Sequence, residues 1–244
     1  MNELSELKGR MRALRNVKKV RLVNLPKLSV MILRFAFVDV KELEMENASL
    51  ESHEVLSEVM RKKRIEEERR VNEKKRRREE GIVLNAEDLE NLANDVTSIS
   101  VKGCDDYEKE TLDLSRFTKL KELKIASKCF NYVSQVRIVG LLELQTVSIG
   151  EAAFQNNAKD CKLQIQNCPS LLSMTIGNES FKSFSQLEMS GVKSLQSITM
   201  GCGCFRDANC VMRNMESLNR VTLGDLCFEK SLHTVIESGV QYEC

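Results

Sequence analysis

The 244-residue chain contains no tryptophan, three tyrosines, two histidines and two prolines. Histidine supplies much of the acid–base catalysis and metal binding in proteins, so its scarcity leaves few of the usual components of an active site. Nor does one sign of charge dominate, because 37 basic residues against 36 acidic ones give a net charge of +1. No field of the whole molecule therefore attracts it to nucleic acid or anionic lipid, and any such attraction must be local.

Long apolar runs are also missing. The longest, residues 30–33 and 35–38, are far too short to span a bilayer, and the first twenty residues alternate apolar with charged positions. We therefore expect neither a signal peptide nor a membrane span. Nine cysteines without a sign of export indicate free thiols in a reducing compartment, which predicts a cytoplasmic protein.

The chain does contain an internal repeat. Five phenylalanines are spaced by 24, 27, 24 and 23 residues, and apolar residues recur at fixed distances before each. The phenylalanines are Phe130, Phe154, Phe181, Phe205 and Phe228; ten residues earlier lie Leu120, Leu144, Leu171, Leu195 and Leu218. Each unit reads φ-x-φ-x-x-φ-x-x-L-x-x-φ-x-φ-G-x-x-x-F, where φ is apolar, with alanine at the glycine position of the first unit. It thus contains two short segments with the alternation of a strand.

One such coil cannot bury its own apolar face, so neighbouring coils must stack. The repeat therefore predicts a mainly β solenoid with two short parallel strands in each 23–27-residue coil. We expect the glycine to serve a corner that needs positive φ, and the phenylalanine to fill the interior.

The arrangement resembles the leucine-rich repeat superfamily, and most closely its BspA-like class with the cadence LxxIxIGxxAFxxC. Residues 144–154 are nearly a copy of that cadence, and residues 194–205 are a second. The resemblance extends over roughly residues 1–45 and 96–240. We expect residues 1–45 to form an N-terminal repeat block and residues 96–244 the main solenoid. It implies a leucine-rich-repeat fold and a protein-binding or scaffold function.

Residues 46–95 show no repeat and are expected to form a charged helical insertion or linker. Between Arg61 and Glu80, 17 of 20 positions are charged, 11 of them positive, and Leu50–Glu80 has the composition of one helix. This segment has four open interpretations: a solvated linker, a two-part nuclear-import signal, a nucleic-acid-binding arm and a coiled-coil partner surface. The basic patch that the second and third would use comprises Lys62, Lys63, Arg64, Lys74, Lys75, Arg76, Arg77 and Arg78.

Catalytic and metal-binding patterns are weak. No two adjacent coils place acids at the centre of the first segment, and neither histidine, His53 or His233, falls in register with a serine and an aspartate. Cys202, Cys204 and Cys210 form no paired CxxC and have no nearby histidine, while Cys129, Cys204 and Cys227 occupy a periodic position that suits packing. We expect no enzyme activity, no metal and no cofactor.

The outward positions of the two segments differ. The second segments present mostly serine and threonine, a pattern typical of a hydroxyl ladder that stabilises stacked strands, with a flat polar recognition face as the alternative. The first segments present a mixed-charge strip, Asp113, Arg137, Gln164 and Glu188, which we favour as the partner-binding surface. The expected function is a non-enzymatic protein-interaction module without membrane contact; the alternative is a nuclear or nucleic-acid-associated protein acting through the basic helix 61–78.

The ends of the array show no evident polar cap, although solenoids usually protect theirs. Three explanations stay open: a longer parent protein, self-association through the ends, or a short helix such as 86–93 that covers an internal edge.

Overall fold

The computed structural model describes residues 19–25, 42–48, 50–104 and 106–237. The chain divides into two compact units, residues 1–73 and 74–244, and the division falls within the helix α1 (Leu50–Glu80). In the described residues no helix is both long and apolar enough to cross a bilayer.

The first unit contains two parallel strands, β1 (Lys19–Leu25) and β2 (Glu42–Ala48). Val20 pairs with Leu43 and Leu22 with Met45, a spacing of 23 residues that equals the shortest coil of the repeat. Arg21 lies beside its partner Glu44, with Nε 3.4 Å from Oε2. The remaining positions of the N-terminal repeat block, among them residues 28–37, lie outside the described residues.

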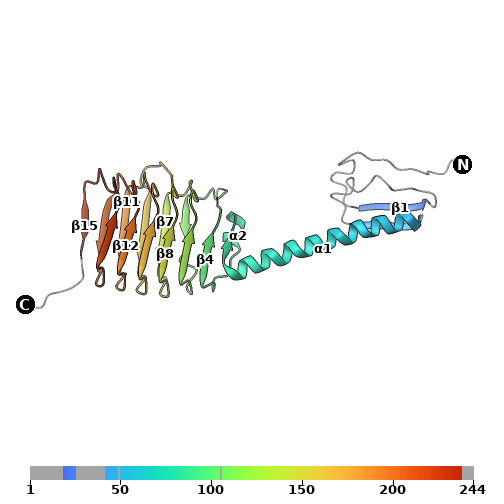
Figure 1. Ribbon diagram of the computed structural model, residues 1–244, viewed down its shortest axis with the longest axis horizontal. Helices are drawn as coiled ribbons and strands as arrows, with labels where there is room; N and C mark the ends of the chain where they lie inside the picture. The colour runs from blue at the N-terminus through green and yellow to red at the C-terminus, as the bar shows by residue number, and fades with distance from the viewer. Residues whose placement is uncertain (1–18, 26–41, 49, 105, 238–244) are drawn as a thin grey trace, which may run out of the picture. The chain divides into compact units, whose positions relative to one another are not determined.

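The second unit consists mainly of two parallel sheets. The first has the order β14-β12-β10-β8-β6-β4-β3 and the second the order β15-β13-β11-β9-β7-β5, so successive coils contribute to the two sheets in turn (Figure 1). The seven-stranded sheet comprises β3 (Ile82–Val83), β4 (Ser98–Val101), β6 (Glu122–Ile125), β8 (Thr146–Ile149), β10 (Ser173–Ile176), β12 (Ser197–Met200) and β14 (Arg220–Leu223). The six-stranded sheet comprises β5 (Thr111–Asp113), β7 (Gln135–Val139), β9 (Lys162–Gln166), β11 (Gln186–Ser190), β13 (Asn209–Arg213) and β15 (Thr234–Ile236). The prediction of a β-solenoid is confirmed.

The alternation of each strand sorts its side chains between the interior and the surface. In β8, for example, Val147 and Ile149 are buried, while Thr146 and Ser148 face outward. The leucines that precede the second segments are also buried: Leu120, Leu144, Leu171 and Leu195 are fully inaccessible. Because every coil repeats this pattern in register, the buried side chains of successive coils form continuous columns.

The corner after each of β6, β8, β10, β12 and β14 holds the repeat phenylalanine inside the solenoid, as the sequence predicts. Phe130, Phe154, Phe181 and Phe205 are at most 1% exposed, and their rings stack with Phe228 in one column. Phe154 and Phe181 are closest, with ring centroids 4.5 Å apart and planes within 8°. Such offset stacks add a favourable aromatic contact to the area that each ring buries.

The expected reason for the repeat glycine is wrong. Positive φ angles at this corner belong to the phenylalanines themselves, 58° at Phe154 for example, and not to the glycine four residues earlier. A Cβ on Gly150 would lie 2.5 Å from the Ser127 amide nitrogen, and one on Gly177 would lie 2.7 Å from that of Glu151. Glycine is required because the backbone of one coil passes too close to the previous coil for any side chain.

The seven-stranded sheet begins before residue 96, where the sequence repeat becomes readable. The strand β3 pairs in parallel with β4, and the short helix α2 (Ala86–Glu90) follows it. Asn85 caps α2 by accepting a hydrogen bond from the Asp88 amide through Oδ1. Val83, Leu89 and Leu92 are buried in the same core as the repeat residues.

Candidate interaction surface

The mixed-charge strip lies on the outer face of the six-stranded sheet. Asp113 on β5 pairs with Arg137 on β7, Arg137 with Gln164 on β9, and Gln164 with Glu188 on β11. The next position in the row is Val211 on β13. The ladder therefore brings the four predicted residues together in one straight row, at the spacing of about 4.8 Å between adjacent strands.

The charges of the strip are paired along it. Arg137 Nε lies 3.3 Å from Asp113 Oδ2, and Gln164 Nε2 donates to Glu188 Oε2 over 3.3 Å. Lys162, on β9, reaches the other oxygen of Glu188 at 2.7 Å, and its hydrogen bond lowers the pKa of that carboxyl. At Asp113 partial burial raises the pKa, but hydrogen bonds from Ser115 and the charge of Arg137 outweigh it, so the pKa is lowered. Both carboxyls are therefore ionised at neutral pH.

The outer face of the seven-stranded sheet is chemically different. Ser148, Thr175, Thr199 and Thr222 occupy equivalent positions on four successive strands, with Lys124 preceding them on β6. Short hydroxyl side chains at equivalent positions stabilise neighbouring strands. This row offers nearly the same chemistry in every coil, so it has less capacity than the strip to specify a partner.

The predicted basic patch is divided between the two units. Lys62, Lys63 and Arg64 belong to the first, whereas residues 74–78 belong to the second. Carboxylates accompany most of its cations: Lys62 lies 3.2 Å from Glu58, Lys74 3.3 Å from Glu87, Arg76 3.8 Å from Glu80 and Lys75 4.0 Å from Glu79. These exposed pairs are individually weak, but they reduce the positive potential available to a phosphate.

Arg77 differs from the rest of the patch because it attaches the end of α1 to the solenoid. Its Nη1 donates to Asp88 Oδ2 over 3.0 Å, and the two side chains are 14% and 2% exposed. The same oxygen accepts a hydrogen bond from the Leu84 amide. The position of Arg77 suits a structural contact better than recognition of a ligand.

The cysteines belong to the interior more than to a reactive centre. Burial raises the pKa of Cys204 to about 12 and that of Cys210 to about 11, so both thiols stay protonated. Among the described residues no group of three or more histidine, cysteine, aspartate or glutamate side chains is arranged to hold a metal ion.

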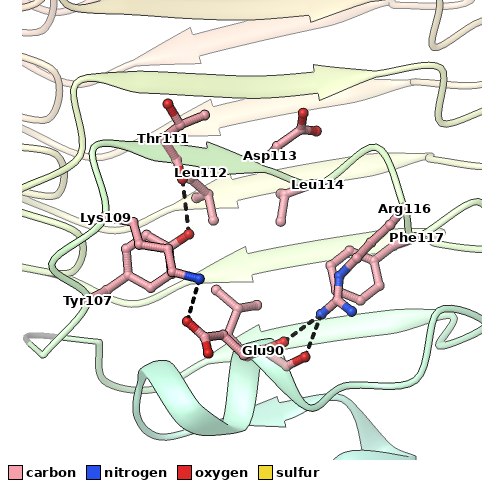
Figure 2. Close-up of a pocket in the computed structure, with 10 residues that line it drawn as sticks. Glu90, Tyr107, Lys109, Thr111, Leu112, Asp113, Leu114, Arg116 and Phe117 are labelled. Carbon is pink, nitrogen blue, oxygen red and sulfur yellow. Dashed lines mark hydrogen bonds and ion pairs between the residues drawn. The ribbon is translucent and has the colours of Figure 1, made fainter.

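A cavity of about 350 Å³ lies beside the edge strand β5, and the sequence did not point to it. Leu89, Leu112, Leu114 and Phe117 give it apolar walls, with Asp113 and Thr111 along one side (Figure 2). Two polar contacts cross the space between β5 and α2. Lys109 Nζ is 2.7 Å from Glu90 Oε1, and Arg116 Nη2 donates to the carbonyls of Leu89 and Glu90 over 2.8 and 3.2 Å (Figure 2).

The signal for this cavity is an interruption of the repeat. Residues 84–97 separate two strands of the seven-stranded sheet but contain the helix α2 in place of a strand of the other sheet. This α2 matches one of the three explanations for the array ends, a short helix near residues 86–93. The sequence could indicate a helix at an edge, but not that the helix would leave space beside β5.

Comparison with protein-family models, with curated proteins and with solved structures gives no match for this chain.

Proposed function

We propose that this chain is a non-enzymatic protein-interaction or scaffold module of leucine-rich-repeat type, and that the mixed-charge strip contacts its partner. The observation that carries the proposal is the row of Asp113, Arg137, Gln164 and Glu188 on adjacent strands of one sheet. The regular strands hold the outward side chains at fixed positions, and these side chains change from coil to coil. The sheet therefore presents a specific pattern of charge that needs little further ordering when a partner binds. Electrostatic complementarity of this kind selects among partners.

Two properties of the strip support this assignment. The strands are held by parallel ladders on both sides over β7 to β13, so the strip is preorganised and loses little conformational entropy on binding. Its charged groups also remain partly exposed, with Asp113 and Arg137 at 43% and 49%, so a partner can reach them.

The test is capture of partners by the full chain with matched variants. Three baits are compared. They are the wild-type chain, the strip variant Arg137→Glu/Glu188→Lys, and the control variant Lys124→Glu/Thr175→Lys on the other sheet. Nuclease-treated lysate is passed over each bait and the eluate is identified by mass spectrometry. We expect a discrete set of proteins that the control variant retains and the strip variant loses. If both variants retain the captured proteins, the strip is excluded as the binding surface. If both lose them, the variants are misfolded, which circular dichroism detects.

The alternative function is nucleic-acid association through the basic helix 61–78, with a nuclear location. It rests on the 11 cations between Arg61 and Glu80, several of which are well exposed, Lys75 at 74% for example. The test replaces Lys74, Lys75, Arg76 and Arg78 by glutamine and leaves the structural Arg77 in place. Binding to a double-stranded DNA oligonucleotide should then weaken greatly, and wild-type binding should fall steeply with salt. If the variant binds as the wild type does, the alternative is excluded.

We further propose that the repeats are of the BspA-like class and that α1 is an insertion between two repeat blocks of a cytoplasmic protein. The 23-residue register of β1 and β2 supports a first block of the same period as the main solenoid. No cofactor enters this proposal, and the partner is a protein.

A further inference from the structure

The six-stranded sheet ends at β5, while the seven-stranded sheet continues past the same level through β4 and β3. In the coil that contains β4, residues 84–97 supply α2 and irregular chain where the other coils supply a strand. Among the described residues, no strand therefore occupies the position next to β5 in the six-stranded sheet. The cavity beside β5 lies at this position.

The backbone of β5 is oriented to receive a strand there. On the side of β7, the Gln135 amide donates to the Glu110 carbonyl, and the Leu114 amide donates to the Arg137 carbonyl, both over 3.0 Å. Alternate residues of a strand bond to opposite neighbours, so Thr111 and Asp113 direct their backbone groups toward the cavity. One of these groups, the Thr111 carbonyl, accepts a hydrogen bond from Tyr107 Oη over 3.0 Å. An edge with this geometry is the usual template for strand addition.

The other coils show which sequence fits the position. The strands of this sheet place two apolar side chains inward around one outward residue, as Val136, Arg137 and Ile138 do on β7. On β7 the outward residue is Arg137, which pairs with Asp113 across the ladder. A strand on the opposite side of β5 would place its own central residue beside the same carboxylate, where a cation is favourable and an anion is not.

We propose that the edge of β5 binds an extended peptide segment of a partner protein with the pattern φ-(Lys/Arg)-φ. The two apolar side chains enter the cavity walled by Leu89, Leu112 and Leu114, the backbone bonds to Thr111 and Asp113, and the central cation lies beside Asp113. The Lys109–Glu90 ion pair and the hydrogen bonds from Arg116 to the α2 carbonyls, which cross this space, open to admit the peptide. This site differs from the mixed-charge strip in its binding mode, which uses the strand edge in place of the sheet face. Asp113 borders both.

The test uses the full chain and two fluorescein-labelled peptides, STVKVTS and STVEVTS, with affinity measured by fluorescence polarisation. The wild-type chain should bind the lysine peptide about two- to fivefold more tightly, the range expected for one cross-strand charge pair. Asp113→Lys should reverse that preference. Glu216→Lys is the matched control, because it makes the same charge change on an exposed carboxylate in the corner before β14, far along the solenoid from β5, and it should leave both affinities unchanged.

A second variant tests the backbone bonds without changing charge. Thr111→Pro removes an amide that faces the cavity and is not used in pairing with β7, a position where an edge strand tolerates proline. We expect at least tenfold weaker binding of the lysine peptide while the circular dichroism spectrum is retained. Equal affinity for the two peptides, or no response to Asp113→Lys in a folded variant, would overturn the proposal. Loss of lysate partners from the strip variant with normal peptide binding would separate this site from the proposed function.

Discussion

In three of the coils, the residue before the stacked phenylalanine forms a side-chain hydrogen bond to the preceding coil. Ser180 Oγ donates to the Gly150 carbonyl over 2.6 Å and accepts from the Ala153 amide over 3.1 Å. At the same position one coil later, Cys204 Sγ donates to the Gly177 carbonyl over 3.1 Å. Cys227 Sγ makes the equivalent bond to the Gly201 carbonyl over 3.0 Å. Hydroxyl and thiol thus serve the same contact, which explains the occurrence of both serine and cysteine at this position better than small size alone does.

We expect Ser180→Ala to lower the free energy of unfolding by about 1–3 kcal/mol, because a buried carbonyl and amide lose their partner. Ser180→Cys should recover part of the loss, since a thiol makes this bond elsewhere in the column. Ser183→Ala is the control: Ser183 bonds to Asn157 at the surface and should change stability by less than about 0.5 kcal/mol. Urea unfolding followed by circular dichroism measures all three. Equal effects of the two alanine variants would contradict the assignment.

The raised thiol pKa values predict selective labelling. Cys202 is exposed, whereas Cys204 and Cys210 are buried with pKa values of about 12 and about 11. In the native protein at pH 8, iodoacetamide should therefore modify Cys202 and spare the other two, because only the thiolate reacts. Peptide mass spectrometry gives the extent at each site, with the urea-unfolded chain as the reference in which all three react. Comparable native rates would show that the core opens more readily than the structure implies.

At this scale the sequence predicted the buried columns well and the role of the glycines badly. The burial of Phe154 follows from periodicity, because only an inward position tolerates a large aromatic in every coil. The need for glycine at Gly177 depends on how closely one coil approaches the next. That distance is a property of the stacked assembly, and no local pattern encodes it.

At the scale of the element, the structure of these corners predicts that Gly177→Ala and Ala126→Gly lower the free energy of unfolding by different amounts. Gly177→Ala should cost about 1–3 kcal/mol or more, because the new Cβ would lie 2.7 Å from backbone atoms of the previous coil that cannot move independently. Ala126 occupies the equivalent position of the first such corner, where its amide donates to the Val101 carbonyl. Ala126→Gly should therefore cost only about 0.5–1 kcal/mol, through backbone entropy. Denaturant unfolding of both variants checks this, and the reverse order would disprove the close-approach argument.

The ion pair between Arg77 on α1 and Asp88 on α2 also makes a measurable contribution to stability. Arg77→Met would leave the Asp88 carboxylate buried without its cation, and breaking such a pair costs about 3–5 kcal/mol. Arg69→Met is the matched control, since its side chain is 79% exposed and should matter little. Hydrogen exchange of the α2 amides, together with thermal unfolding, distinguishes local opening from global loss. Unchanged hydrogen exchange of the α2 amides in Arg77→Met would show that the Arg77–Asp88 ion pair does not hold α2 in place.

The sequence indicated the helix over Leu50–Glu80 but not the strand beyond it. Two residues, Ile82 and Val83, are too few to show alternation, and they join the sheet only because β4 provides a partner. The cavity beside β5 was equally invisible, because it arises from the three-dimensional distance between α2 and the edge strand. The members of the mixed-charge strip were readable because each lies between two apolar residues of the repeat, which fix its register although the coil length varies.

On the scale of the whole molecule, the two ends of the described solenoid are unequal. At one end α2 lies beside β5, whereas at the other Val221 and Leu223 on β14 are 39% and 46% exposed. The equivalent residues of β12, Ile198 and Met200, are at most 1% exposed because β14 covers them. The last described coil thus presents apolar side chains and a strand edge together, a combination that favours association.

We therefore expect self-association through this end, visible as a mass that rises with concentration in light scattering coupled to size-exclusion chromatography. Leu223→Lys should shift the equilibrium toward the monomer by placing a charge among the apolar residues. Leu142→Lys is the control, because Leu142 is 61% exposed and lies at a corner away from this end. A monomeric wild-type chain at all concentrations, or equal effects of the two variants, would exclude association at this end.

The corner after the stacked phenylalanine varies in length without disturbing the ladder. The strand β9 begins eight residues after Phe154, whereas β7 begins five after Phe130 and β13 four after Phe205. Gln135 nevertheless pairs with Lys162, and Lys162 with Gln186, in one continuous register. Protein engineers can therefore treat this corner as a grafting point: a foreign epitope spliced in after Phe154 would be displayed on a rigid backbone, and the surrounding coils would need no redesign.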